Sequence, residues 1–200
     1  MNYNLFIMIK KILLAALVVI STNYISAQAK IGLKGGLGFA NAKYTSGTYS
    51  ETYNSIVTPN FGLTLDFKGS ESFNIQSGLM YNGMGGKYSY DGGSTRTHLN
   101  YLSIPLLAKF KFGEGFHGYA GPQLSFLLSA KYKDEDGTTD IKSELKGSGV
   151  FGLFGLGYSL NDKFGLYGEY SAGISNLAKE STGDDKWRAN AFSFGINLNF

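Results

Sequence analysis

The residues best suited to acid–base chemistry are the two histidines, His98 and His117. A histidine that acts as a general base needs a nucleophile within hydrogen-bond distance and a third group that orients its ring. No spacing pattern links His98 to such a nucleophile, so a polar residue at the external end of a strand is the favoured interpretation. His117 is expected near a turn, facing inward, as a filler of the interior. The sequence therefore predicts no catalytic residue.

Two further patterns could bind ions or phosphates. The acidic segment is formed by Asp134, Glu135, Asp136 and Asp140. It does not match an EF-hand calcium loop, because Gly137 comes too early in the pattern and no glutamate closes it. A divalent-ion site is the minor alternative there, and a solvated loop is favoured. The glycines at 152, 155 and 157 resemble a dinucleotide fingerprint, but no helix follows to hold a phosphate. We predict no metal site and no cofactor.

Composition excludes several classes of protein. The 200 residues include no cysteine, so disulfides and thiolate metal sites are ruled out. Glycine is frequent, at 28 residues, and aromatic residues make up 15 %, which favours β structure. The formal net charge is +3, and without Lys10 and Lys11 the balance is 16 basic against 15 acidic residues. That balance gives no reason to expect a nucleic-acid partner.

The first residues have the order of a secretory signal peptide. Lys10 and Lys11 precede the apolar run 12–20, and a small, polar stretch follows at 21–27. We expect residues 1–27 to be a signal peptide cleaved after Ala27, with cleavage after Ala29 as the alternative. Translation starting at Met8 would also leave a complete leader. A membrane anchor is disfavoured because the uncharged run is shorter than the roughly 20 residues a spanning helix needs.

The rest of the chain alternates apolar and polar residues by twos, as β-strands do. No helical period and no second domain are evident. The alternating segments are 31–39, 57–67, 73–81, 104–112, 116–128, 150–160, 164–174 and 192–200.

Connections between these segments alternate in length. Polar stretches at 41–55, 83–97, 131–147 and 177–188 each have roughly 12 to 17 residues, above the usual hairpin length. Tight turns are expected at 68–70, 113–115 and 161–163. Outer-membrane barrels have short periplasmic turns and long external loops. We therefore predict an all-β fold, in which residues 28–200 form an eight-stranded antiparallel up-and-down transmembrane β-barrel.

The character of the two strand faces separates a membrane barrel from a soluble, lipocalin-like one. The more polar face is rich in Gly, Ser, Asn and Ala, which suits the narrow, filled interior of eight strands. The opposite face is large and apolar, with aromatic residues near strand ends, as at a membrane interface. A membrane barrel is favoured. Its aromatic residues near strand ends are Phe39, Phe67, Phe73, Tyr81, Phe112, Phe116, Phe164 and Phe200.

Several segments resemble the PorT-like outer-membrane barrel family of Bacteroidota, whose barrels are of the OmpX/OmpA-like eight-stranded type. These segments are 101–107 (YLSIPLL), 120–122 (AGP), 155–158 (GLGY) and 170–177 (YSAGISNL). The resemblance covers the predicted barrel and implies its fold and its place in the outer membrane. The last strand, ending in Phe200, is similar to the terminal aromatic signal read by the barrel-assembly machinery. Family membership implies little about activity, because one fold hosts many functions.

Four charged residues fall on the polar faces of their strands: Lys34, Asp66, Lys109 and Glu169. Isolated buried charges are costly, so we expect a charge network that plugs the lumen, with separate hydration of each charge as the alternative.

The favoured function is a non-enzymatic, monomeric outer-membrane barrel that contacts lipid. Its four external loops would have a structural or surface-interaction role with an unidentified ligand. The alternatives are a lipid-modifying enzyme, a narrow channel and an accessory barrel of a secretion system.

Overall fold

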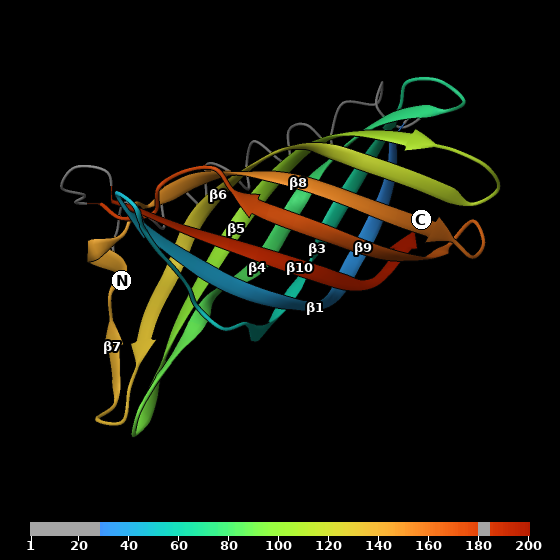
Figure 1. Ribbon diagram of the computed structural model, residues 1–200. Helices are drawn as coiled ribbons and strands as arrows, with labels where there is room; N and C mark the ends of the chain where they lie inside the picture. The colour runs from blue at the N-terminus through green and yellow to red at the C-terminus, as the bar shows by residue number, and fades with distance from the viewer. Residues whose placement is uncertain (1–28, 180–184) are drawn as a thin grey trace, which may run out of the picture.

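The computed structural model describes residues 29–179 and 185–200, which form ten strands in one antiparallel sheet (Figure 1). Two strands are short, β2 (Tyr49–Thr52) and β7 (Thr138–Asp140), and one 3-10 turn, η1 (Lys142–Glu144), follows β7. The eight long strands are β1 (Ala29–Ser46), β3 (Ile56–Lys68), β4 (Phe73–Tyr90), β5 (Gly93–Lys111), β6 (Phe116–Lys133), β8 (Ser148–Ser159), β9 (Phe164–Gly173) and β10 (Lys186–Asn199).

The eight long strands close into a barrel. Each pairs with the next along the chain, and β1 pairs with β10 from Gly32 opposite Asn199 to Thr45 opposite Lys186. Closure leaves the long strands without a free edge. The predicted eight-stranded up-and-down barrel is confirmed, while its predicted signal peptide, residues 1–27, lies outside the described residues. Where the structure describes the chain, none of its helices has the length and apolar character needed to cross a membrane.

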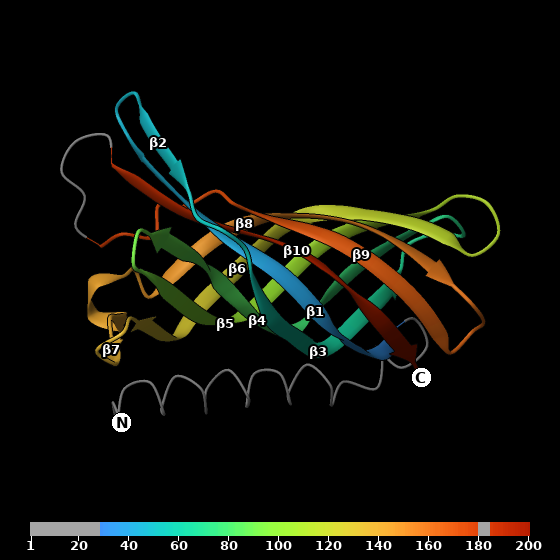
Figure 2. The same ribbon diagram turned by 60° about the horizontal axis from the view of Figure 1, so that its bottom comes forward.

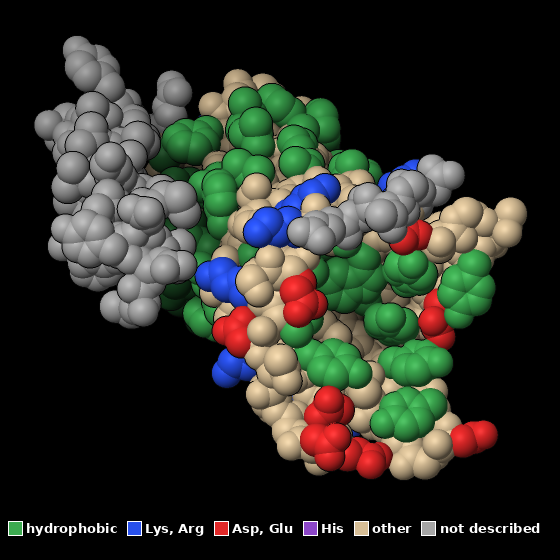
Figure 3. All heavy atoms as spheres, turned by 90° about the vertical axis from the view of Figure 1, so that its left-hand side faces the viewer, with side chains coloured by type: hydrophobic (Ala, Val, Ile, Leu, Met, Phe, Trp, Pro, Cys, Tyr) green, Lys and Arg blue, Asp and Glu red, His purple; other side chains and the backbone are tan. Residues whose placement is uncertain are grey.

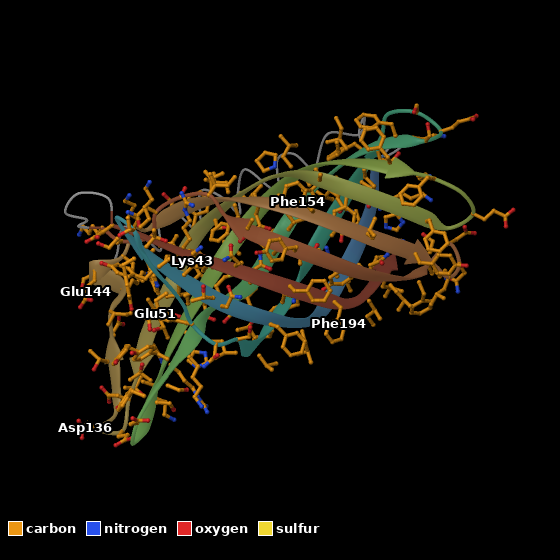
Figure 4. All side chains as sticks on the ribbon, viewed as in Figure 1. Lys43, Glu51, Asp136, Glu144, Phe154 and Phe194 are labelled. Carbon is orange, nitrogen blue, oxygen red and sulfur yellow. The ribbon has the colours of Figure 1, made fainter. Side chains whose placement is uncertain are left out.

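The apolar face of the strands points outward, as predicted. Leu106 and Phe154 are 57 % and 56 % exposed, and Phe154 and Phe194 project from the barrel wall in Figure 4. Polar residues of the alternate register are buried, among them Gln123 and Ser125 at 1 % exposure. A surface this apolar suits a hydrocarbon environment rather than water.

One end of the barrel carries only short connections, at 69–72, 112–115 and 160–163. In the second of these, Gly113 and Gly115 have φ values of 69° and 78°, which residues with a side chain rarely adopt. The chain ends here too, where the backbone N–H of Phe200 donates to the oxygen of Ile31 at 2.9 Å. The three short turns predicted at 68–70, 113–115 and 161–163 lie at this end, close to their predicted bounds. We call this the turn end and the opposite one the outer end.

The extents of two predicted long loops, 83–97 and 41–55, are wrong. Residues 83–97 are largely strand, because β4 continues to Tyr90, β5 starts at Gly93, and only Asp91 and Gly92 form the turn. Ladder hydrogen bonds satisfy the backbone whatever the polarity of the side chains, so the hairpin extends past the apolar belt. Similarly, β1 runs on to Ser46 and forms a hairpin with β2, which projects from the barrel in Figure 2.

Candidate functional site: a lumen filled in two layers

Near the turn end the lumen holds a layer of charged residues. The Nζ atom of Lys34 on β1 forms an ion pair with Glu169 on β9. The Tyr119 hydroxyl donates to Glu169 at 3.0 Å, and Lys34 Nζ lies 4.1 Å from the centre of the Tyr167 ring. Both charged side chains are buried, at 9 % and 6 % exposure. The pair is thus surrounded by hydroxyl and aromatic groups that compensate the loss of water.

A second pair joins β5 to β3. Lys109 Nζ lies 3.2 Å from Asp66 Oδ1, and Gln76 Nε2 donates to Asp66 Oδ2 at 2.9 Å. Within the described parts of the chain, no ion pair connects this pair to Lys34 and Glu169. The four predicted lumen residues therefore all face inward, and they form two separate pairs. We call these four residues, with Gln76, Tyr119 and Tyr167, the charged layer.

Little space remains between the two pairs. The gap bounded by Lys34, Lys109, His117, Tyr119 and Tyr167 has a volume of about 20 Å³. A gap of that size holds roughly one water molecule. Side chains therefore close the lumen at this level.

Glycines on the facing strand make room for the large lumen side chains. A Cβ atom on Gly155 would lie 2.3 Å from the Tyr119 ring, and one on Gly157 would lie 2.2 Å from His117 Nε2. Those distances are well below van der Waals contact, so a side chain at either position requires its neighbour to move. The glycines at 155 and 157 serve packing in a narrow barrel.

Toward the outer end the lumen is apolar. The Tyr101 and Phe151 rings meet edge to face with centroids 5.7 Å apart, and both side chains have 0 % exposure. We call this buried cluster the apolar plug. Its members are Ala40, Ile56, Met84, Leu99, Tyr101, Leu127, Ala130, Leu145, Phe151, Leu177, Ala189 and Ala191.

Two members of the apolar plug come from connecting segments rather than strands. Leu145 follows η1, and Leu177 follows β9. The backbone holds these segments together, since Lys146 N–H donates to Leu177 O at 2.9 Å and Leu177 N–H donates to Trp187 O at 2.8 Å. The two segments around Leu145 and Leu177 thus fold inward over the barrel mouth. Between the plug and the charged layer, the Ser103 and Ser125 hydroxyls share a hydrogen bond of 2.8 Å.

Comparison with known proteins agrees with this architecture. A family model described as an outer membrane protein beta-barrel domain matches residues 25–179. The chain belongs to this family. It is an outer-membrane protein, as its lipid-facing surface indicates. No curated protein sequence matches the chain.

Solved structures of outer-membrane barrels share the fold. Neisserial surface protein A (NspA) is 15 % identical with a TM-score of 0.53, and the match covers 86 % of this chain and 99 % of that one. The attachment invasion locus protein Ail of Yersinia pestis, crystallised with the heparin analogue sucrose octasulfate, is 13 % identical with a TM-score of 0.50, covering 86 % and 99 %. At these identities the likeness shows a common fold.

The two histidines of this outer-membrane barrel occupy different surroundings. His117 is buried in the lumen near the turn end, as the sequence suggested. His98 lies within β5, between Gly85 and Lys131 on the adjacent strands, rather than at a strand end. The reason is the extension of β4 and β5 beyond the predicted loop boundary. Neither ring makes a side-chain hydrogen bond with a serine or a carboxylate in the described segments.

The acidic segment forms a tight turn. Asp134 Oδ1 accepts the backbone N–H groups of Asp136 and Gly137 at 3.1 and 3.0 Å. Across residues 29–179 and 185–200, no group of three or more His, Cys, Asp or Glu side chains is placed to hold a metal ion. A carboxylate that accepts hydrogen bonds from its own turn has a structural role.

Four lumen aromatic residues were missed by the sequence analysis: Tyr101, Tyr119, Phe151 and Tyr167. All four lie on the inner register of strands whose other inner residues are mainly small or polar. Their register was the available signal, because an aromatic residue out of phase with the apolar face must point into the barrel.

Proposed function

We propose that this protein is a closed, non-enzymatic outer-membrane barrel of the PorT-like kind, whose outer hairpins bind a partner at the cell surface. The observation that carries the proposal is the filled lumen. The charged layer leaves about 20 Å³ between its pairs, and the apolar plug covers the outer mouth. These features disfavour the narrow channel, because an interior filled by side chains offers solutes no continuous path.

The outer hairpins are suited to binding. Tyr53 and Tyr88 lie with ring centroids 5.7 Å apart, and Tyr88 and Tyr90 lie 6.2 Å apart. Tyr49 and Tyr90 are 57 % and 46 % exposed. Figure 3, which views the outer end, shows hydrophobic side chains among carboxylates. Exposed tyrosines provide large, rigid contact areas and are enriched in protein interfaces.

Conductance separates this function from a channel. We expect the purified full-length protein in planar lipid bilayers to show no steady open-channel current. A reproducible unitary conductance would overturn the closed-barrel proposal. Leak from damaged bilayers is identified by repeating the measurement on bilayers without protein.

Surface binding is tested on whole cells. Replacing Tyr88 and Tyr90 by serine should reduce capture of the bound surface partner, while the same change at the lipid-facing Tyr170 should leave it intact. Cross-linking on intact cells, followed by mass spectrometry, identifies the partner. Unchanged cross-link patterns in the Tyr88→Ser/Tyr90→Ser variant would contradict a role for the hairpins.

Export and assembly complete the proposal. We propose that residues 1–27 direct export and are removed, leaving a barrel domain of residues 28–200 that acts as a monomer in contact with lipid. We further propose that Phe200 is part of the signal recognised by the barrel-assembly machinery. Its exposed ring, at 70 %, and its position directly after β10 support that role.

A further inference from the structure

Four cationic side chains and one histidine are brought together on the outer wall across three neighbouring strands. Arg96 on β5 lies directly opposite Lys87 on β4 and opposite Lys133 on β6. One step nearer the membrane, His98 lies opposite Lys131. Directly opposed residues of antiparallel strands project from the same face. We call these five residues the basic cluster.

The basic cluster lies just beyond the lipid-facing part of the same strands. Leu102 on β5 is opposite Phe126 on β6, and Ile104 is opposite Leu124. These residues share the outward register of His98 and Arg96, so apolar contact with lipid gives way to positive charge within a few residues. A tilted strand rises roughly 2.5 Å per residue along the barrel axis. Flexible lysine and arginine side chains can therefore reach the headgroup level.

No acidic side chain of the described segments neutralises this cluster. The ion pairs of those segments, at up to 4.0 Å, are the two in the lumen. The acids beside the cluster have partners within their own turns. Asp134, next to Lys133, accepts the backbone N–H groups of Asp136 and Gly137. Asp140 on β7 lies opposite Lys131, and its Oδ1 accepts the backbone N–H of Lys142 at 2.9 Å. Like charges directly opposite one another destabilise a sheet. The row from Lys87 through Arg96 to Lys133 therefore favours an external anion.

We propose that the basic cluster binds the phosphate groups of outer-leaflet glycolipid. Arg96 provides a planar fork that matches two phosphate oxygens, and the lysines add point charges around it. A lipid phosphate is anchored beside the apolar pairs Leu102–Phe126 and Ile104–Leu124, whereas a soluble anion has no contact with them. The cluster therefore selects a headgroup whose acyl chains lie against β5 and β6. This inference does not depend on the partner of the outer hairpins.

The test uses full-length protein in phosphatidylcholine nanodiscs that contain either bisphosphorylated lipid A or its dephosphorylated form. The protein is then released from the nanodiscs and purified. Native mass spectrometry measures the lipid that stays bound to it. Wild-type protein should retain the phosphorylated form about tenfold more than the dephosphorylated form. Arg96→Gln/Lys133→Gln should lose essentially all of this tenfold preference, because each basic residue near an anionic surface contributes on the order of a fivefold change, and two together about 25-fold.

Matched variants separate binding from folding. Lys68→Gln/Lys163→Gln removes two exposed charges at the turn end and should retain the lipid. The charge-keeping Arg96→Lys should retain only part of it, because lysine lacks the planar fork. Heat-modifiable migration confirms that each variant folds. Equal retention by wild-type protein and Arg96→Gln/Lys133→Gln would overturn the proposal. So would equal retention of the two lipid forms, or complete displacement of the lipid by millimolar inorganic phosphate, which would indicate a general anion site.

Discussion

The charged layer and the apolar plug close the same lumen by opposite means. Every member of the charged layer comes from a long strand, and its contacts are directional, as in Lys109 to Asp66 at 3.2 Å. The apolar plug combines strand residues with Leu145 and Leu177 from the outer connections. Ion pairs and hydrogen bonds depend on fixed geometry, whereas apolar packing depends mainly on filled volume.

The difference in solvent access between the two ends explains why one layer is charged and the other apolar. At the turn end, an open recess of about 590 Å³ reaches the charged layer and is lined by Lys30, Lys68, Lys111 and Asp162 among others. Charges close to water are less costly than charges sealed in a dry interior. At the outer end, the connecting segments cover the mouth, so apolar side chains are the stable filling. Residues of the barrel strands can therefore position the charges by themselves, whereas filling the dry outer end also requires residues from folded loops.

The largest effect is expected from removing one member of the buried Lys34–Glu169 pair. Glu169→Ala leaves Lys34 without its counter-ion and should lower the free energy of unfolding by about 3–5 kcal/mol. Urea unfolding of the barrel in detergent, followed by tryptophan fluorescence and heat-modifiable migration, measures the change. The control is Glu114→Ala in an exposed turn, expected to stay within about 0.5 kcal/mol of wild type.

A double variant sharpens the interpretation. Lys34→Met/Glu169→Leu removes both charges and should recover most of the stability lost in Glu169→Ala. If the double variant were as unstable as Glu169→Ala, the loss would reflect packing around Tyr119 instead of an unpaired charge. The charged layer would then stabilise the barrel in the same way as the apolar plug.

The next effect concerns the apolar plug. Leu177→Ala should cost about 2–4 kcal/mol, because the side chain is 1 % exposed and its removal leaves a cavity. Leu156→Ala, on the lipid-facing wall, is the matched control and should cost less, since lipid fills the space that it leaves. Equal losses in the two variants, measured by the same urea unfolding, would mean that Leu177 does not seal the mouth.

The two layers also differ in how far the sequence predicts them. Alternation by twos was sufficient to assign Lys34 and Glu169 to the inner face, because strand periodicity fixes orientation residue by residue. The partner of each charge depends on strand tilt and on stagger around the closed barrel, which local periodicity does not contain. Leu145 and Leu177 lie in segments without regular alternation, so their burial depends on long-range contacts. The alternation in the lengths of the connections predicted the topology. It assigned residues 83–97 to a loop although they are largely strand, because polar residues also form ladder hydrogen bonds.

A smaller effect is expected for the second ion pair. Lys109→Ala should lower the free energy of unfolding by about 1–3 kcal/mol, less than Glu169→Ala, because Asp66 keeps its hydrogen bond from Gln76. Its side chain is also nearer the open recess at the turn end. Lys133→Ala, in the exposed part of β6, is the control and should change stability by less than about 0.5 kcal/mol. If Lys109→Ala matched this control, the pair would contribute nothing measurable to closure.

The smallest effect on stability is expected at Phe200, which belongs to neither layer. Its ring is 70 % exposed, so Phe200→Ser should cost less than about 1 kcal/mol once the barrel is folded. Its backbone bond to Ile31 is independent of the side chain and should persist. We nevertheless expect a marked fall in the amount of folded protein in outer-membrane fractions, because the terminal ring would be recognised before the barrel closes. Phe164→Ser, another exposed aromatic change at the turn end, is the control and should leave that amount nearly unchanged. Equal levels of heat-modifiable barrel in wild-type and Phe200→Ser cells would show that closure depends on the lumen and wall alone.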